Sequence, residues 1–152
     1  MSENLTELRP DDFRFCCESA VRFRDVDAMN HVNNAVYLTY FEIARDGYAR
    51  ALGHCEADAS PAERFPFILL DVYCRYVSAA EPGERLLIHL RTSRMGGKSF
   101  EFEYLITSAG DRRTVAVGRS TQVYYDYASG RTEPIPEHFR QLVAAIEEQS
   151  SG

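Results

Sequence analysis

Residues 21–53 read VRFRDVDAMNHVNNAVYLTYFEIARDGYARALG, and this stretch determines much of the expected fold. Its first part, residues 24–34, is crowded with Asp and Asn, whose side chains bond to nearby backbone groups and favour turns and helix caps. From residue 35 to residue 52, large apolar residues recur near the helical period, and Gly53 is placed to end a helix. The stretch therefore predicts a turn-rich segment followed by a long helix.

The predicted helix is apolar over most of its circumference. Only a thin stripe of Glu42, Asp46 and Arg50 is charged. The apolar positions are Tyr37, Leu38, Tyr40, Phe41, Ile43, Ala44, Tyr48 and Leu52. Since a surface helix usually keeps a wide polar face, we expect this helix to be buried on most sides, with a sheet curled around it.

Strands are expected on both sides of the helix in the sequence. Runs rich in β-branched and aromatic residues predict strands over residues 13–23, 67–79, 85–94, 99–108 and 113–126. The last three runs are joined by short turns, so we expect them to be antiparallel neighbours. A polar loop is expected over residues 54–66, and a surface helix over residues 136–148.

The predicted fold class is α+β, with an antiparallel sheet of about five strands wrapped around one long central helix. Residues 1–12 form a polar N-terminal segment that we expect to be loosely ordered, and residues 13–148 form the domain. One helix covers only one face of a sheet, which leaves side chains such as Tyr73 and Tyr104 for edges or a second surface. We therefore expect a homo-oligomer.

Composition excludes several classes of protein. The chain has 152 residues, of which 45% are hydrophobic and 26% charged, and this suits one globular domain. No apolar stretch approaches the roughly 18 residues of a membrane span, and no secretion signal is evident, so we expect a cytoplasmic location without a membrane partner. The net charge of -6 argues against a nucleic-acid partner. The four cysteines form no CxxC pair, so no metal site is expected.

The chemistry is expected where the turn-rich segment meets the helix. A helix N-terminus offers unpaired backbone N–H groups and a partial positive charge, which polarise a carbonyl or stabilise an oxyanion. A carboxylate just upstream, such as Asp27, can attack that carbonyl or activate water. The residues alone leave a structural alternative open, in which the Asp and Asn residues of this segment are only turn formers and caps.

The segment strongly resembles the hotdog-fold acyl-CoA thioesterases of the 4-hydroxybenzoyl-CoA thioesterase type. The matching pattern is D-x-D-x-x-x-H-x-N-N-x-x-Y followed by FE-x-AR, which runs here from Asp25 to Arg45. The hairpin over residues 94–100 and a closing V-x-x-D before an Ile-Pro pair also match. The resemblance implies a hotdog fold and hydrolysis of an acyl-CoA thioester, with coenzyme A as part of the substrate and no separate cofactor.

Residue by residue, the resemblance assigns the catalytic roles. It makes Asp27 the catalytic carboxylate, and it makes the backbone N–H of Asn34 the group that polarises the thioester carbonyl. The best-studied members carry an aromatic residue where this chain has Asn34, but the donor is a backbone group. Tyr37 is expected to line the acyl pocket. His31 is expected at the substrate site, either bonding within the turn or orienting Asp27 or a water molecule.

The resemblance also places the coenzyme A nucleotide near the strand hairpins, at an interface of a homodimer or homotetramer. Arg94, Lys98 and Ser99 flank a Gly-Gly turn there and are the expected contacts. Guanidinium groups suit phosphate, and further candidates are Arg75 and Arg119.

A thioester needs few catalytic groups because its leaving thiol has a reference pKa of roughly 8.5. The sequence holds no G-x-S-x-G nucleophile elbow. An anhydride intermediate and water activated by a general base both remain open. So do two other functions, a hotdog hydratase or dehydratase, whose usual D-x-N-P-x-H spacing differs here, and a non-catalytic acyl-thioester binding protein.

Another branch of hotdog thioesterases uses an acidic residue in the middle of the helix, and Glu42 is the residue that fits this role. Because Glu42 lies three residues before Arg45, we expect the two to form an ion pair on one helix face. Asp27 is therefore the expected catalytic carboxylate, and Glu42 is expected to be structural.

Overall fold

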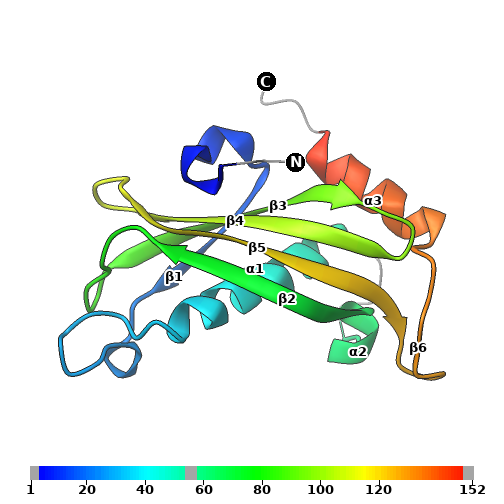
Figure 1. The fold of residues 1–152 in the computed structure, drawn as a ribbon, viewed down its shortest axis with the longest axis horizontal. Helices are drawn as coiled ribbons and strands as arrows, with labels where there is room; N and C mark the ends of the chain where they lie inside the picture. The colour runs from blue at the N-terminus through cyan, green and yellow to red at the C-terminus, as the bar shows by residue number, and fades with distance from the viewer. Residues whose placement is uncertain (1–3, 54–57, 149–152) are drawn as a thin grey trace.

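A computed structural model describes residues 4–53 and 58–148 of the chain (Figure 1). Its helices and strands are β1 Phe15–Ala20, α1 Val36–Leu52, α2 Pro61–Arg64, β2 Phe67–Tyr76, β3 Arg85–Met95, β4 Ser99–Ser108, β5 Thr114–Asp126, β6 Arg131–Thr132 and α3 Glu137–Glu147. The 3-10 turns are η1 Leu5–Glu7, η2 Pro10–Asp12 and η3 Phe23–Asp25. The two predicted helices and five predicted strands are confirmed, with their ends moved by a few residues. None of the described helices is long and apolar enough to cross a membrane.

The strands form one sheet in the order β1-β3-β4-β5-β2, and every neighbouring pair is antiparallel. The strands β3, β4 and β5 are consecutive neighbours, as their short turns predict. The sheet curls around α1, while α3 lies against the end of the sheet where β3 finishes (Figure 1). This arrangement is the expected α+β hotdog fold.

One face of α1 packs against the concave side of the sheet. The buried residues of α1 are Tyr37, Tyr40, Phe41, Ala44, Tyr48, Ala49 and Leu52. Burying a large apolar side chain contributes about 1.5–3 kcal/mol, so this face supplies much of the stability of the domain. The helix ends at Gly53, whose φ of 67° lies in the left-handed region that favours glycine.

Gly118 of β5 allows α1 to approach the sheet closely. A Cβ atom at this position would lie 2.5 Å from the carbonyl oxygen of Tyr73 and 2.6 Å from a ring carbon of Phe41. Both distances are shorter than real Cβ contacts. Any side chain at Gly118 would therefore displace α1 or disturb the pairing of β5 with β2.

Tyr104 differs from its predicted place on an outer surface. It is fully buried and faces α1, where its ring stacks on Phe41 with centroids 4.1 Å apart. Its hydroxyl accepts a hydrogen bond of 3.0 Å from Arg45 and shares one of 2.6 Å with Ser120. The alternation of β4 separates its residues into two sets, but only the packing of α1 decides which set faces inward.

Residues 4–12 of the N-terminal segment cover part of the outer face of the sheet, which differs from the loose order expected for them; residues 1–3 lie outside the described residues. Leu5, Leu8 and Phe13 are buried there in one cluster with Leu105 of β4 and Val117 of β5. Leu5 and Leu8 attach this otherwise polar segment to the sheet, and Arg91 of β3 donates to the carbonyl of Asp12 at 3.2 Å. The chain therefore buries this part of its outer face without a second copy.

His89 of β3 is buried beneath the N-terminal segment, with 6% of its surface exposed. Its ring lies 5.6 Å from that of Phe13, and Nε2 is 3.3 Å from the hydroxyl of Thr107. Burial disfavours the charged imidazolium and lowers the pKa of His89 from its ordinary value of 6.5.

This lowered pKa predicts an acid-sensitive fold. The unfolded chain binds the His89 proton at a higher pH than the folded chain, so this contribution to stability is complete above the unfolded pKa and is lost as the pH falls below about 6.5. In urea denaturation, His89→Gln should show a shallower loss of unfolding free energy between about pH 6.5 and 5 than the parent. Parallel curves for the two proteins would contradict this assignment.

Candidate active site

The loop before α1 is closed by pairing between its two ends. Val26 and Val32 form an antiparallel bridge, and the N–H of Asp27 donates to the carbonyl of His31 at 2.8 Å. Asn30 turns the chain at the tip with a φ of 63°, a conformation that Asn tolerates better than most residues. The turn-rich pattern of the sequence thus folds into one compact loop.

Asp25 is a structural residue of this loop. Its carboxylate is 2% exposed, accepts the N–H of Arg22 at 2.9 Å and lies 3.2 Å from the guanidinium of Arg22. The hydroxyl of Tyr40 on α1 also donates to it at 3.1 Å. Burial acts to raise the pKa of Asp25, but the bonds from Arg22 and Tyr40 outweigh burial and lower it.

Asp27 is exposed on the same loop and has one occupied carboxylate oxygen. Its Oδ1 accepts the N–H groups of Met29 at 2.9 Å and His31 at 3.4 Å. Its Oδ2 bonds to no group in the described part of the chain. Asp27 is therefore a turn former, as the structural alternative states, and also presents a carboxylate oxygen to solvent.

At the entry to α1, one backbone N–H has no hydrogen-bond acceptor among the described residues. Asn33 Oδ1 accepts the N–H of Ala35 at 2.9 Å, and the Asn33 carbonyl accepts the N–H of Val36 at 2.9 Å. The hydroxyl of Tyr76 donates to the carbonyl of Asn34 at 3.0 Å. Within residues 4–53 and 58–148, the N–H of Asn34 has no acceptor. It is thus an unused donor at the helix entry, and its role toward a thioester carbonyl stays a prediction.

A hollow of about 240 Å³ lies at the helix entry. Its lining residues are His31, Val32, Asn34, Tyr37, Tyr76, Val77, Ser78 and Ala79. The rings of Tyr37 and Tyr76 meet edge to face there, with centroids 5.1 Å apart. The predicted residues Asn34, Tyr37 and His31 are thus brought together. Asp27 belongs to the same loop but does not line this hollow in the single chain. The sequence pattern did not indicate Tyr76, which reaches the site from β2.

The backbone and the ring of His31 have different surroundings. Its N–H and carbonyl both bond to Asp27, which makes it part of the turn. His31 lines the hollow, and its imidazole ring bonds to no other described group. The turn-bonding role expected for His31 is present, and the ring is available to a ligand.

The prediction of an ion pair between Glu42 and Arg45 is wrong. Arg45 donates instead to the hydroxyl of Tyr104 on β4. Glu42 is exposed and forms no bond or ion pair with the described residues. The spacing of three residues allowed the pair, but the buried hydroxyl on the facing sheet offered Arg45 a partner shielded from water.

The residues expected to bind the nucleotide lie far from Asp27 within one chain. Arg94 and Lys98 are exposed at the hairpin between β3 and β4, and α1 begins near the opposite end of the sheet (Figure 1). Arg140 of α3 holds this hairpin by donating to the carbonyls of Gly96 at 2.6 Å and Gly97 at 3.2 Å. Neither Arg94 nor Lys98 has an acidic partner within the described ranges.

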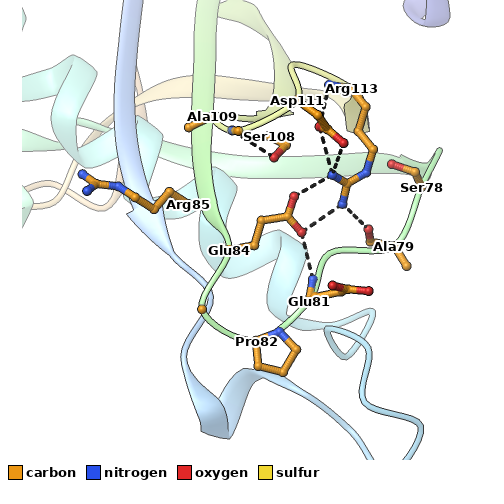
Figure 2. A pocket seen from close by; sticks show the side chains of 12 residues that line it. Ser78, Ala79, Glu81, Pro82, Glu84, Arg85, Ser108, Ala109, Asp111 and Arg113 are labelled. Carbon is orange, nitrogen blue, oxygen red and sulfur yellow. Dashed lines mark hydrogen bonds and ion pairs between the residues drawn. The ribbon is translucent and has the colours of Figure 1, made fainter.

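Another hollow, of about 930 Å³, lies between two turns at the helix-entry end of the sheet (Figure 2). Arg113 stands in it between Glu84 at 2.7 Å and Asp111 at 3.0 Å, and the carbonyl of Ala79 accepts a further bond from it at 2.6 Å. The hydrogen bond from Arg113 holds the pKa of Glu84 at about 2. Because carboxylates surround this arginine, the hollow does not favour phosphate.

The match to known families agrees with this geometry. Residues 21–143 match the thioesterase-like superfamily, and the chain belongs to this family. The match does not distinguish the 4-hydroxybenzoyl-CoA type, which stays a prediction.

Three similar proteins illustrate the family. An uncharacterized Bacillus subtilis protein, YsmA, is 30% identical over 93 residues, which span 61% of this chain and 60% of YsmA. The acyl-CoA thioesterase YbgC of Haemophilus influenzae is 25% identical over 76% of this chain and 82% of its own. A Thermus thermophilus thioesterase, crystallised with coenzyme A and zinc, is 30% identical with a TM-score of 0.79, covering 92% of this chain and 98% of the other.

The cap at the helix entry predicts a difference between two neighbouring asparagines. Asn33→Ala removes the acceptor of the Ala35 N–H and should lower the free energy of unfolding by about 1 kcal/mol. Asn34→Ala should leave it nearly unchanged, because the Asn34 side chain is exposed and bonds to no described residue. Urea denaturation of both variants measures the difference, and equal losses would show that Asn33 is not the cap.

Proposed function

We propose that this protein is an acyl-CoA thioesterase that hydrolyses a thioester to a free acid and coenzyme A. The observation that carries the proposal is the unpaired N–H of Asn34, held at a helix entry beside the loop of Asp27. A fixed N–H donor and a nearby carboxylate are the two groups that the reaction requires. The coenzyme A bound to the similar Thermus protein supports the substrate class.

In the proposed reaction, the thioester carbonyl accepts the N–H of Asn34, which stabilises the negative charge that develops on its oxygen. Asp27 either removes a proton from water as the water adds to the carbonyl carbon, or adds itself and forms an anhydride that water then opens. In both routes the C–S bond breaks and the thiolate of coenzyme A leaves. Tyr37 and Tyr76 offer aromatic surface to the acyl group beside the carbonyl.

The edge strand β2 supports a second copy of the chain as part of the site. Half of the large exposed hydrophobic side chains of the described chain lie on β2 or directly after it, namely Leu69, Leu70, Tyr73, Tyr76 and Val77. An unpaired apolar edge favours association with another strand. A dimer formed by antiparallel pairing of two β2 edges would place these side chains beside those of the second copy.

Such pairing would also complete the nucleotide site. In antiparallel pairing, Tyr76 at the end of one β2 lies near Phe67 at the start of the other. The register of the sheet places Phe67 beside Tyr124, and Ser99 beside Val123. The hairpin of Lys98 and Ser99 in one copy would therefore stand at the helix-entry end of its partner.

The catalytic carboxylate is tested by two isosteric substitutions. Asp27→Asn should lower kcat for acyl-CoA hydrolysis by on the order of 100-fold or more, since it removes the base or nucleophile and keeps the shape. Glu42→Gln should keep both turnover and stability, because Glu42 is exposed and unpaired. Release of free thiol from a panel of acyl-CoAs measures the turnover of both variants. Loss of turnover in a folded Glu42→Gln protein, with Asp27→Asn near the parent, would move the catalytic role to α1.

The same assays separate the other functions. A hydratase or dehydratase would change the enoyl absorbance of crotonyl-CoA without releasing thiol. A binding protein would bind the acyl-CoA panel without any turnover.

The shared site is tested by mixing two defective chains. Asp27→Asn should lack catalysis, and Arg94→Ala combined with Lys98→Ala should raise KM for acyl-CoA. In a mixed dimer, one of the two sites combines the intact Asp27 of one copy with the intact hairpin of the other. Purified mixed dimers should therefore recover turnover at low acyl-CoA concentration above either parent variant. No recovery in a dimer, or full activity in a monomer, would refute the shared site.

A further inference from the structure

A small hollow of about 130 Å³ opens on the outer face of the sheet. Its lining residues are Asn4, Leu5 and Thr6 of the N-terminal segment, Tyr73 and Arg75 of β2, and Arg119 of β5. Tyr73 lies directly opposite Arg119 in the register, and Arg75 is two residues further along β2. These three side chains lie on the face opposite to α1, because Cys74 between them packs into the core.

Both arginines of this hollow lack an acidic partner. Neither Arg75 nor Arg119 forms an ion pair within the described part of the chain. Arg75 is exposed and Arg119 is half-buried, and the other half-buried arginines of the described chain bond to carboxylates, hydroxyls or carbonyls. The guanidinium of Arg119 lies over the ring of Tyr73, 5.7 Å from its centroid. This cation–π contact holds Arg119 at the hollow while leaving its N–H donors unused.

Two carboxylates near the hollow, those of Glu103 and Glu7, already have hydrogen-bond partners. Glu103 lies opposite Arg119 on β4, but its Oε1 bonds to Arg91 at 2.8 Å. The Oε2 of Glu103 is buried without a partner and does not line the hollow. Glu7 accepts a hydrogen bond of 3.3 Å from Asn4. Two positive charges thus share one small hollow that no described carboxylate lines.

We propose that this hollow binds a phosphate group. Guanidinium groups bind phosphate through paired N–H donors, and two of them match the charge of about -1.5 to -2 on a phosphate monoester better than the single charge of a carboxylate. The hollow, of about 130 Å³, has room for a phosphate group. The site is separate from the helix-entry hollow and does not depend on thioester hydrolysis.

Calorimetric titration with inorganic phosphate at low ionic strength tests the site. The parent should bind about one phosphate per chain, and Arg75→Gln combined with Arg119→Gln should weaken binding by at least about tenfold. Arg75→Gln alone, on an exposed side chain, should give a smaller loss and keeps the test valid if the double variant does not fold. Arg131→Gln is the matched control, since Arg131 is exposed, unpaired among the described residues and outside the hollow.

Phosphate that binds equally well to the parent and both variants, or no saturable binding to the parent, would overturn the proposal. Titration with coenzyme A and with its form lacking the 3′-phosphate identifies the source of the phosphate. A loss of coenzyme A affinity in the double variant that is absent for the dephosphorylated form would assign the site to the nucleotide. A loss for inorganic phosphate alone would support a site for a separate phosphorylated ligand.

Discussion

The buried carboxylate of Asp25 is the constraint on which the helix entry depends. It joins η3 to α1 through its bonds from Arg22 and Tyr40, while its backbone carbonyl accepts the N–H of Asn33 at 2.8 Å. Bonds to a charged group contribute about 1.5–3 kcal/mol each, and a buried carboxylate without them would be costly. Because both ends of the loop are fixed in this way, Asp27 and the N–H of Asn34 are held in place relative to each other.

The packing of α1 on the sheet is the second constraint on the geometry of the helix entry. Gly118 brings β5 close to Phe41, and Tyr104 fills the space beside it while giving Arg45 a polar partner. Because α1 can shift little against this surface, its first turn is held at a constant distance from the end of β2. Tyr76 can then reach the carbonyl of Asn34, and a residue of the sheet thereby fixes a peptide group of the helix.

The distribution of charge matters more for ligand binding than the size of the hollows. The hollow of about 930 Å³ contains Arg113, but Glu84 and Asp111 neutralise this arginine, so the hollow offers little to an anion. The cations without acidic partners in the described chain include Arg94 and Lys98 at the hairpin and Arg75 and Arg119 in the small outer hollow. In a chain with a net charge of -6, only such local positive groups can attract phosphate.

The amino-acid pattern by itself determined the long helix, the three consecutive antiparallel strands and the family, because periodicity, turn residues and a spaced motif are local properties of a sequence. It also singled out the helix entry with Asn34, Tyr37 and His31. Tertiary structure alone decided that Tyr104 faces inward, that Arg45 bonds to it rather than to Glu42, and that the N-terminal segment covers the outer sheet face. These outcomes depend on which groups from distant parts of the chain meet across the sheet, and a local pattern carries no information about the burial and competing partners that decide those contacts.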